Sequence, residues 1–157
     1  MTGNNIMQKT TDRRARKYTI TLNNPLDMNP PMTHEQIKKS IGELCSVTYW
    51  CMADEVGVKE QTPHTHIYLY SVSPIRFSTI KRRFNQGHIE SAYGSSTENR
   101  DYILKAGKWK NTAKTETSIP GTFEEFGIMP AKETMSEKGE LQFIYDMIES
   151  GMSTAEI

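Results

Sequence analysis

Hydrophobic and polar residues alternate along two segments of the chain, and a period of two predicts β-strands. The first segment, Lys17–Leu22 (KYTITL), is closed by the turn residues of NNPLDMNPP. The second is PHTHIYLY, Pro63–Tyr70, whose two histidines point to one face together with Tyr68 and Tyr70. Two further strands are predicted at 46–55 (SVTYWCMADE) and 88–91 (HIES). The segment 46–55 forms a hairpin with the histidine-bearing strand across a polar loop.

Helical spacing predicts the remaining elements. A first helix begins at Thr33, whose spacing to Gln36 makes a capping box, and its apolar residues Ile37, Ile41 and Leu44 share one face. Further helices are predicted at 76–84, at 96–105 and, as an amphipathic helix, near 136–150. The segment TFEEFGIMP (122–130) is predicted to be irregular and to pack on the domain. Since strands and helices do not alternate strictly, the pattern favours an α+β fold with an antiparallel sheet.

Composition limits the number of domains and the location of the protein. A chain of 157 residues with 36% hydrophobic content supports one core and therefore one domain. No segment approaches the roughly eighteen apolar residues of a membrane span, and the N-terminus lacks an apolar signal sequence. We therefore expect a soluble intracellular protein without a membrane partner. Cys45 and Cys51 lack a CxxC spacing and are interpreted as reduced thiols in a core.

The net charge of zero hides two regions of opposite charge. Residues 1–114 carry 17 Lys and Arg against 10 Asp and Glu, whereas residues 115–157 carry 2 against 9. A basic body fits either a solvated basic face or a polyanionic partner. Basic and aromatic residues interleave, which favours a nucleic-acid surface. The basic residues concerned are Arg13, Arg14, Arg16, Lys17, Arg76, Lys81, Arg82, Arg83, Arg100, Lys105, Lys108 and Lys110.

The pair His64 and His66 is the first candidate for chemistry. Taken alone, the octapeptide fits two solvent-facing histidines and a metal site equally well. If segment 46–55 pairs with the histidine-bearing strand, Glu55 lies across from the histidines, with Asp54 as a competitor for the same role. Two imidazoles and a carboxylate suit Mn²⁺ or Mg²⁺, and zinc accepts the same types of ligand.

The segment NRDYILK (Asn99–Lys105) is the second candidate. In a helix Asn99, Tyr102 and Lys105 are three residues apart and share a face. A phenol with a pKa of about 10 is a poor nucleophile until a metal polarises its target or a cation favours the phenolate. Lys105 could favour the phenolate or stabilise charge on a phosphate. A tyrosine in an amphipathic helix usually belongs to the core, so the pattern gains weight only together with the histidine strand.

Three motifs in this order resemble the HUH endonuclease domains of rolling-circle replication initiator (Rep) proteins, in the geminivirus and circovirus (CRESS-DNA) branch that includes related plasmids. YTITLNNP (Tyr18–Pro25), PHTHIYLY and NRDYILK resemble the first, second and third family motifs, and Glu55 lies nine residues before His64 as the family's metal-binding acid does. Thr65 departs from the hydrophobic residue between the histidines. Lys108 lies where some relatives carry an acidic residue, so a fourth protein ligand is in doubt.

The resemblance, which runs from about Lys17 to Pro130, implies a five-stranded antiparallel sheet flanked by helices, similar to RNA-recognition domains. It implies a basic arm at 1–16, the endonuclease domain at 17–130, and a linker with an amphipathic helix at 131–157 leading to a C-terminal helicase, whose GxxxxGK[ST] loop is not in this chain. Glu55, His64 and His66 would hold Mn²⁺ or Mg²⁺. Tyr102 would attack single-stranded origin DNA with help from Lys105, forming a 5′-phosphotyrosine and a free 3′-OH, and the reverse reaction would rejoin ends.

The resemblance and the charge pattern also imply DNA contacts and partners. The expected DNA-binding residues are Arg14, Arg16, Thr21, Asn23, Asn24, Arg76, Lys81, Arg82, Arg83 and Asn99. Host replication proteins are expected partners of a monomer located in the nucleus for a eukaryotic virus or in the cytoplasm for a bacterial plasmid. A rival interpretation is a non-catalytic binding module whose exposed Tyr68 and Tyr70 stack bases. A third is a zinc hydrolase without covalent chemistry.

Overall fold

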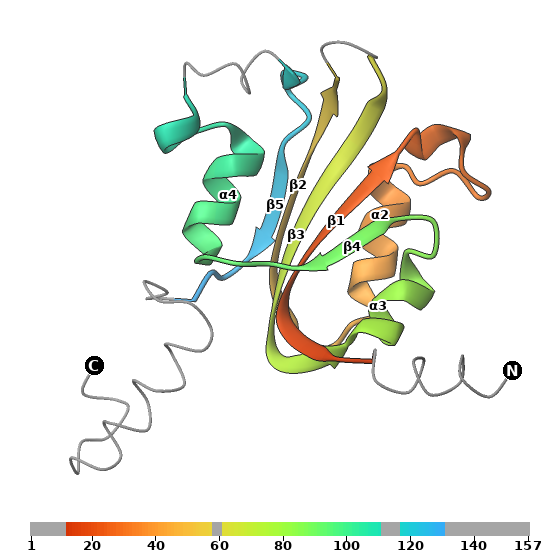
Figure 1. Cartoon of the computed structure of the whole chain (residues 1–157), viewed down its shortest axis with the longest axis vertical. Helices are drawn as coiled ribbons and strands as arrows, with labels where there is room; N and C mark the ends of the chain where they lie inside the picture. The colour runs from red at the N-terminus through yellow and green to blue at the C-terminus, as the bar shows by residue number, and fades with distance from the viewer. Residues whose placement is uncertain (1–11, 58–60, 111–116, 131–157) are drawn as a thin grey trace, which may run out of the picture.

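A single five-stranded antiparallel sheet forms the centre of the protein (Figure 1). The computed structural model describes residues 12–57, 61–110 and 117–130. The strand order is β4-β1-β3-β2-β5. The strands are β1 (Arg14–Asn23), β2 (Val47–Val56), β3 (Pro63–Arg76), β4 (His88–Ser91) and β5 (Glu124–Gly127). The fold class and the five-stranded sheet predicted from the sequence are confirmed.

Helices cover both faces of this sheet (Figure 1). The α-helices are α2 (His34–Gly42), α3 (Phe77–Arg83) and α4 (Ser96–Leu104), and two short 3-10 helices are η1 (Pro25–Asp27) and η2 (Gly107–Trp109). Helix α2 begins after Thr33, whose hydroxyl accepts a hydrogen bond from the backbone N–H of Gln36. This is the Thr33 half of the capping box predicted from the sequence. Helices α2 and α3 lie on one face and α4 lies on the other.

The alternation along β3 divides the core into two layers. Ile67 and Leu69 pack in the larger layer under α2 and α3, whereas Tyr68 belongs to the smaller layer under α4. The Tyr68 hydroxyl bonds to the Ser96 hydroxyl at 2.6 Å, and Tyr68 is completely buried. The prediction that Tyr68 is exposed for base stacking is therefore wrong, because α4 covers it. Tyr70 is partly buried against the same layer.

Two strands extend beyond their predicted ends. Strand β1 begins at Arg14, so the end of the predicted basic arm belongs to the sheet. Strand β3 continues six residues past Tyr70 to Arg76, because its second half pairs with the start of β1 in the register Ala15–Ile75 and Arg14–Arg76. The predicted helix at 136–150 lies outside the described residues.

The segment TFEEFGIMP contains the fifth strand, so the prediction of an irregular segment is wrong. Glu124–Gly127 pairs with β2 at the edge of the sheet. Its sequence EEFG lacks apolar alternation, and side-chain contacts hold it instead, among them the stacking of Phe126 on Trp50. Gly127 has φ 99°, and a Cβ there would collide with the Thr48 carbonyl oxygen, so the pairing requires glycine.

The two cysteines differ in environment. Cys51 is buried and burial raises the pKa of its thiol to about 12, which fits the predicted core thiol. Cys45 is exposed, so the prediction of a core position is wrong for that residue. In the described part of the chain, no helix has the length and apolar character needed to cross a membrane.

Candidate active site

Strands β2 and β3 bring the candidate metal ligands together at one end of the sheet. Glu55 pairs with His64 in the register, and Ala53 pairs with His66, so all three candidate side chains project from the same face. Their ligand atoms lie within 4.8 Å of one another. The Nε2 atoms of His64 and His66 are 3.4 and 3.7 Å from Glu55 Oε1.

Outer hydrogen bonds orient both imidazole rings. His64 Nδ1 donates to the Thr62 carbonyl oxygen at 3.1 Å, which leaves its Nε2 lone pair directed at the site when the ring is neutral. His66 Nδ1 bonds to the Thr21 hydroxyl at 3.2 Å. Contacts of this kind fix the rings of metal-binding histidines. The donor set of two imidazole nitrogens and one carboxylate oxygen fits a divalent metal, and the choice among Mn²⁺, Mg²⁺ and Zn²⁺ stays a prediction.

The register decides between Glu55 and its competitor Asp54. Asp54 pairs with Thr65 and projects from the opposite face. Its Oδ1 accepts hydrogen bonds from His34 Nε2 at 2.9 Å and from the Thr65 hydroxyl at 2.7 Å. Asp54 therefore belongs to a separate cluster with His34, and Glu55 is the acid of the candidate metal site.

Lys105 lies behind the candidate metal site. It caps α4 in a left-handed conformation with φ 61°, so it lies outside the helix that was predicted to include it. Its buried Nζ forms an ion pair with Glu55 Oε2 at 2.6 Å and lies 3.9 Å from the centroid of the Tyr102 ring. Burial raises the pKa of Glu55, but Lys105 and the two histidines outweigh burial and hold this pKa below its usual value. The helical spacing did not predict this pairing with Glu55.

Tyr102 lies on α4 beside the histidines. Its ring meets the His66 ring edge-on with 6.1 Å between centroids, and Trp109 of η2 packs against it at 4.9 Å. The ring is partly exposed. Asn99, one turn earlier, donates hydrogen bonds to the carbonyl oxygens of Tyr93 and Ser95 and so fixes the segment that leads into the helix. The structure thus places the predicted nucleophile next to the predicted metal ligands.

Helix α4 is also tied to the edge strand β5. Arg100 donates two hydrogen bonds to Glu125, at 2.7 and 2.9 Å, and the Tyr49 hydroxyl donates to the same carboxylate at 2.7 Å. The Arg100 contact lowers the pKa of Glu125 to about 2. Arg100 was predicted to belong to a basic surface, but its charge is paired here. Lys17 does not belong to that surface either, because it is buried with its Nζ donating to the Gly94 carbonyl.

The predicted DNA-binding residues fall into separate groups. Thr21, Asn23 and Asn24 lie at the end of β1 next to β3, and Asn99 lies one turn from Tyr102 on α4. The other predicted residues lie at the far end of β1 and β3 or on α3: Arg14, Arg16, Arg76, Lys81, Arg82 and Arg83. Ten residues of β3 separate His66 from Arg76, a length of up to about 33 Å. The two groups therefore do not belong to a single surface around the site.

The sequence reasoning missed three residues of the site. Thr62 contributes only a backbone carbonyl to His64, and Thr117 donates its hydroxyl to Glu55 Oε1 at 3.2 Å from a distant segment. Neither has a side-chain pattern that could have revealed it. Trp109, which packs on Tyr102, does have such a signal, since it lies in the basic and aromatic stretch that follows the third motif.

Comparison with known proteins agrees with this geometry. The family described as "Putative viral replication protein" matches residues 15–106, well over half of the chain. The chain is also similar to a replication-associated protein of Human associated cyclovirus 1, with 35% identity over 96 residues. That alignment covers 60% of this chain and 32% of the relative, so the chain spans about a third of the relative's length.

The antiparallel sheet, the Glu-His-His cluster at its end and the tyrosine on a helix beside it define a domain of the HUH replication-protein class. The chain belongs to the viral replication protein family. The family predicted from the three motifs is thereby confirmed.

Proposed function

We propose that this domain nicks single-stranded DNA at a replication origin through covalent attack by Tyr102. The observation that carries the proposal is the position of the Tyr102 ring, edge-on to His66, at the cluster of Glu55, His64 and His66. A tyrosine beside a set of metal-binding side chains is suited to transfer of a phosphoryl group, because the nucleophile and the groups that bind the phosphate are held together.

The reaction transfers the phosphoryl group of a DNA phosphodiester from the 3′ oxygen to the tyrosine oxygen. The Tyr102 phenol loses its proton as its oxygen forms a bond to phosphorus. The bond from phosphorus to the 3′ oxygen breaks, and that oxygen takes up a proton to become a free 3′-OH. The 5′ phosphate remains on Tyr102, and the reverse reaction rejoins the ends. A divalent ion, Mn²⁺ or Mg²⁺, held by Glu55, His64 and His66, would withdraw negative charge from the phosphate when bound.

Several residues around the site have distinct tasks in the proposed reaction. Thr21 and the Thr62 carbonyl hold the two histidine rings in place. Lys105 keeps Glu55 ionised and oriented, a role that adds to the expected action on the phenolate or the phosphate. Because its Nζ faces the centre of the Tyr102 ring, Lys105 also fixes the nucleophile relative to Glu55.

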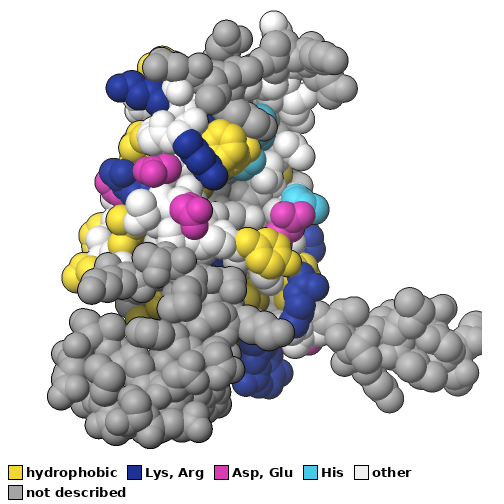
Figure 2. Space-filling view, turned by 60° about the vertical axis from the view of Figure 1, so that its left-hand side comes forward, with side chains coloured by type: hydrophobic (Ala, Val, Ile, Leu, Met, Phe, Trp, Pro, Cys, Tyr) yellow, Lys and Arg dark blue, Asp and Glu magenta, His cyan; other side chains and the backbone are white. Residues whose placement is uncertain are grey.

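A groove beside Tyr102 supports a single-stranded substrate. It has a volume of about 330 Å³, and its lining residues are Tyr93, Gly94, Glu98, Asn99, Tyr102, Lys108 and Trp109. Figure 2 shows this side of the molecule, where hydrophobic and basic side chains lie close to histidines. Aromatic platforms beside basic residues are typical of sites that hold unstacked bases. The origin, the helicase region and the host partners remain part of the proposal.

The test is incubation of the protein with Mn²⁺ and single-stranded oligonucleotides that carry a randomised core, followed by denaturing gels and mass spectrometry. We expect an adduct on Tyr102 that is lost in Tyr102→Phe and in the double alanine variant of His64 and His66. Tyr93→Phe is the matched control, since it removes a hydroxyl from the same groove and should keep the adduct. Cleavage without an adduct would support a hydrolase, and shifted but intact DNA would support a binding module.

A further inference from the structure

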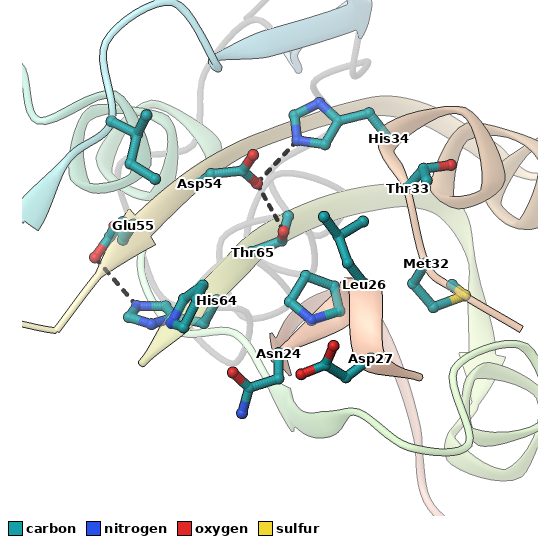
Figure 3. A pocket seen from close by; sticks show the side chains of 13 residues that line it. Asn24, Leu26, Asp27, Met32, Thr33, His34, Asp54, Glu55, His64 and Thr65 are labelled. Atoms are coloured by element: carbon teal, nitrogen blue, oxygen red, sulfur yellow. Dashed lines mark hydrogen bonds and ion pairs between the residues drawn. The ribbon is translucent and has the colours of Figure 1, made fainter. Parts of the chain in front are cut away.

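A second cavity lies at the same end of the sheet, on the side of α2. It has a volume of about 440 Å³ and is enclosed by η1, the start of α2 and the ends of β2 and β3. Figure 3 shows Glu55 and His64 at one end of this cavity and His34, Thr33 and Met32 at the other. A volume of this size is within the range of sites that bind small organic molecules.

The cavity is continuous with the candidate metal site, because Glu55 and His64 belong to the lining of one and to the ligand set of the other. A nucleotide whose phosphate lies at these residues therefore has a neighbouring base within reach of the cavity. The groove with Tyr93 and Trp109 lies beside α4, which packs on the other face of the sheet. A bent single strand that crosses the strand ends would place bases on both sides of the scissile phosphate.

The walls of the cavity suit the flat faces of a base. They are largely apolar, with Pro25, Leu26, Met32, Pro63 and Ile119 among the lining residues. Leu26 is 67% exposed, although it is a large apolar side chain on a short helix. Its side chain therefore offers an apolar surface at the edge of the cavity.

The polar groups of the cavity determine which base fits. Asp54 already accepts hydrogen bonds from His34 and Thr65, so we assign it a structural role in the cavity wall. Asn24 and Asp27 lie at the rim and are exposed. The segment that carries them is held in place, since the backbone N–H of Asn24 donates to the Pro63 carbonyl oxygen at 2.7 Å. A carboxylate only accepts hydrogen bonds, and an amide side chain both donates and accepts.

We propose that this cavity binds one nucleobase next to the scissile phosphate and prefers adenine or cytosine over thymine and guanine. Asp27 accepts from the N6 amine of adenine or the N4 amine of cytosine, whereas thymine O4 and guanine O6 are acceptors in the same place. Leu26 packs on the face of the base. The inference rests on the proposed nicking function and adds a base-specific subsite to it.

The experiment selects single-stranded DNA from a random-core pool with the Tyr102→Phe protein in Mn²⁺ and sequences the bound fraction. Wild-type protein then cuts the selected sequence, which maps the scissile phosphate. We expect thymine and guanine to be depleted roughly five- to tenfold at one position adjacent to that phosphate. Adding Asp27→Asn should remove the depletion at that position alone, because an amide can donate to thymine O4 or guanine O6. Adding Leu26→Ser should weaken binding several-fold for every base there.

Val72→Ser is the matched control, since Val72 is also an exposed apolar residue, 55% exposed, near the far end of β3. It should leave the base profile and the affinity unchanged. Calorimetric Mn²⁺ binding should be equal in all these proteins. An identical base profile with and without Asp27→Asn, despite normal adduct formation by the wild type, would overturn the subsite and leave the nicking function intact. If Asp27→Asn removed the depletion while the wild-type protein formed no adduct, the subsite would be supported and the nicking function would be overturned.

Discussion

Replacing Lys105 and Glu55 singly and together measures the strength of the buried ion pair behind the site. The two side chains are 2% and 5% exposed, and Lys105 Nζ lies 2.6 Å from Glu55 Oε2. At an effective dielectric constant of about 20 this distance gives an attraction of about 6 kcal/mol before desolvation is subtracted. Loss of one partner from a buried pair leaves an uncompensated charge and costs about 3–5 kcal/mol.

The variants are Lys105→Met, Glu55→Gln and the double substitution, and the assay is urea unfolding at neutral pH with a chelator. Each single variant should lose about 3–4 kcal/mol of unfolding free energy, whereas the double variant should lose no more than either, because no charge is then buried alone. The resulting coupling energy is at least about 3 kcal/mol. A folded protein with a typical stability of about 5–15 kcal/mol tolerates such losses.

Arg83 and Glu43 provide a matched control pair. Their N–O distance is also 2.6 Å, but their side chains are 39% and 49% exposed. Solvent screening should limit their coupling energy to less than about 1 kcal/mol. If the losses at Lys105 and Glu55 added within about 0.5 kcal/mol, as at independent sites, the account of a buried pair that orients Glu55 would be refuted.

The remaining predictions concern pH and salt. Burial lowers the pKa of His34, but its hydrogen bonds to Asp54 and Glu124 outweigh burial and raise it. His34 therefore stabilises the fold fully below its unfolded pKa of about 6.5 and loses this effect as the pH rises through the folded pKa. His34→Phe should lower the free energy of unfolding in urea by about 1–2 kcal/mol at pH 5.5 and by less at pH 9. An equal cost at both pH values would contradict a stabilising role of the charged His34 and its two hydrogen bonds. Glu125 has a lowered pKa of about 2, caused first by Arg100, so its contribution is present above about pH 4.3 and is lost as the pH falls towards 2. Glu125→Gln should cost about 1 kcal/mol at pH 7, after allowance for its partial exposure, and almost nothing near pH 2. Affinity for single-stranded DNA should fall with salt with a log–log slope of about −0.7 for each phosphate contacted, and anisotropy titrations that show no slope would refute the basic-face interpretation.

Residue periodicity predicted the parts of this protein that depend on local patterns. The alternation in Pro63–Tyr70 identified β3 and the shared face of His64 and His66, because side-chain direction in a strand follows from position alone. The hairpin pairing identified Glu55 as a candidate. Only the register, which places Glu55 opposite His64 and Asp54 opposite Thr65, separates the two acids. A loop of uncertain length between two strands leaves that register open in the sequence.

Features that depend on distant contacts were missed. Strand β5 has no apolar alternation and is held by Trp50, Arg100 and a glycine that only the β2 edge requires. Lys105 was assigned to a helix by its spacing, but the helix ends one residue earlier and the left-handed turn directs the ammonium group towards Glu55. The rival interpretation as a binding module required an exposed Tyr68, but α4 covers that face, and the sequence of one strand does not indicate which helix covers it.

The nucleophile and the metal ligands are held by different kinds of interaction. Glu55, His64 and His66 belong to strands with hydrogen-bonded neighbours, whereas α4 buries only Ser96 and Ile103 among its residues. The helix is attached mainly by polar contacts: Ser96 with Tyr68, Arg100 with Glu125, and the Lys105 cap with Glu55. The position of Tyr102 relative to the histidines is therefore set by groups that never touch the phosphate. A helix held in this way is expected to adjust to a bound strand more readily than the sheet, which fits the proposed role of Tyr102 in forming and releasing a covalent bond to DNA.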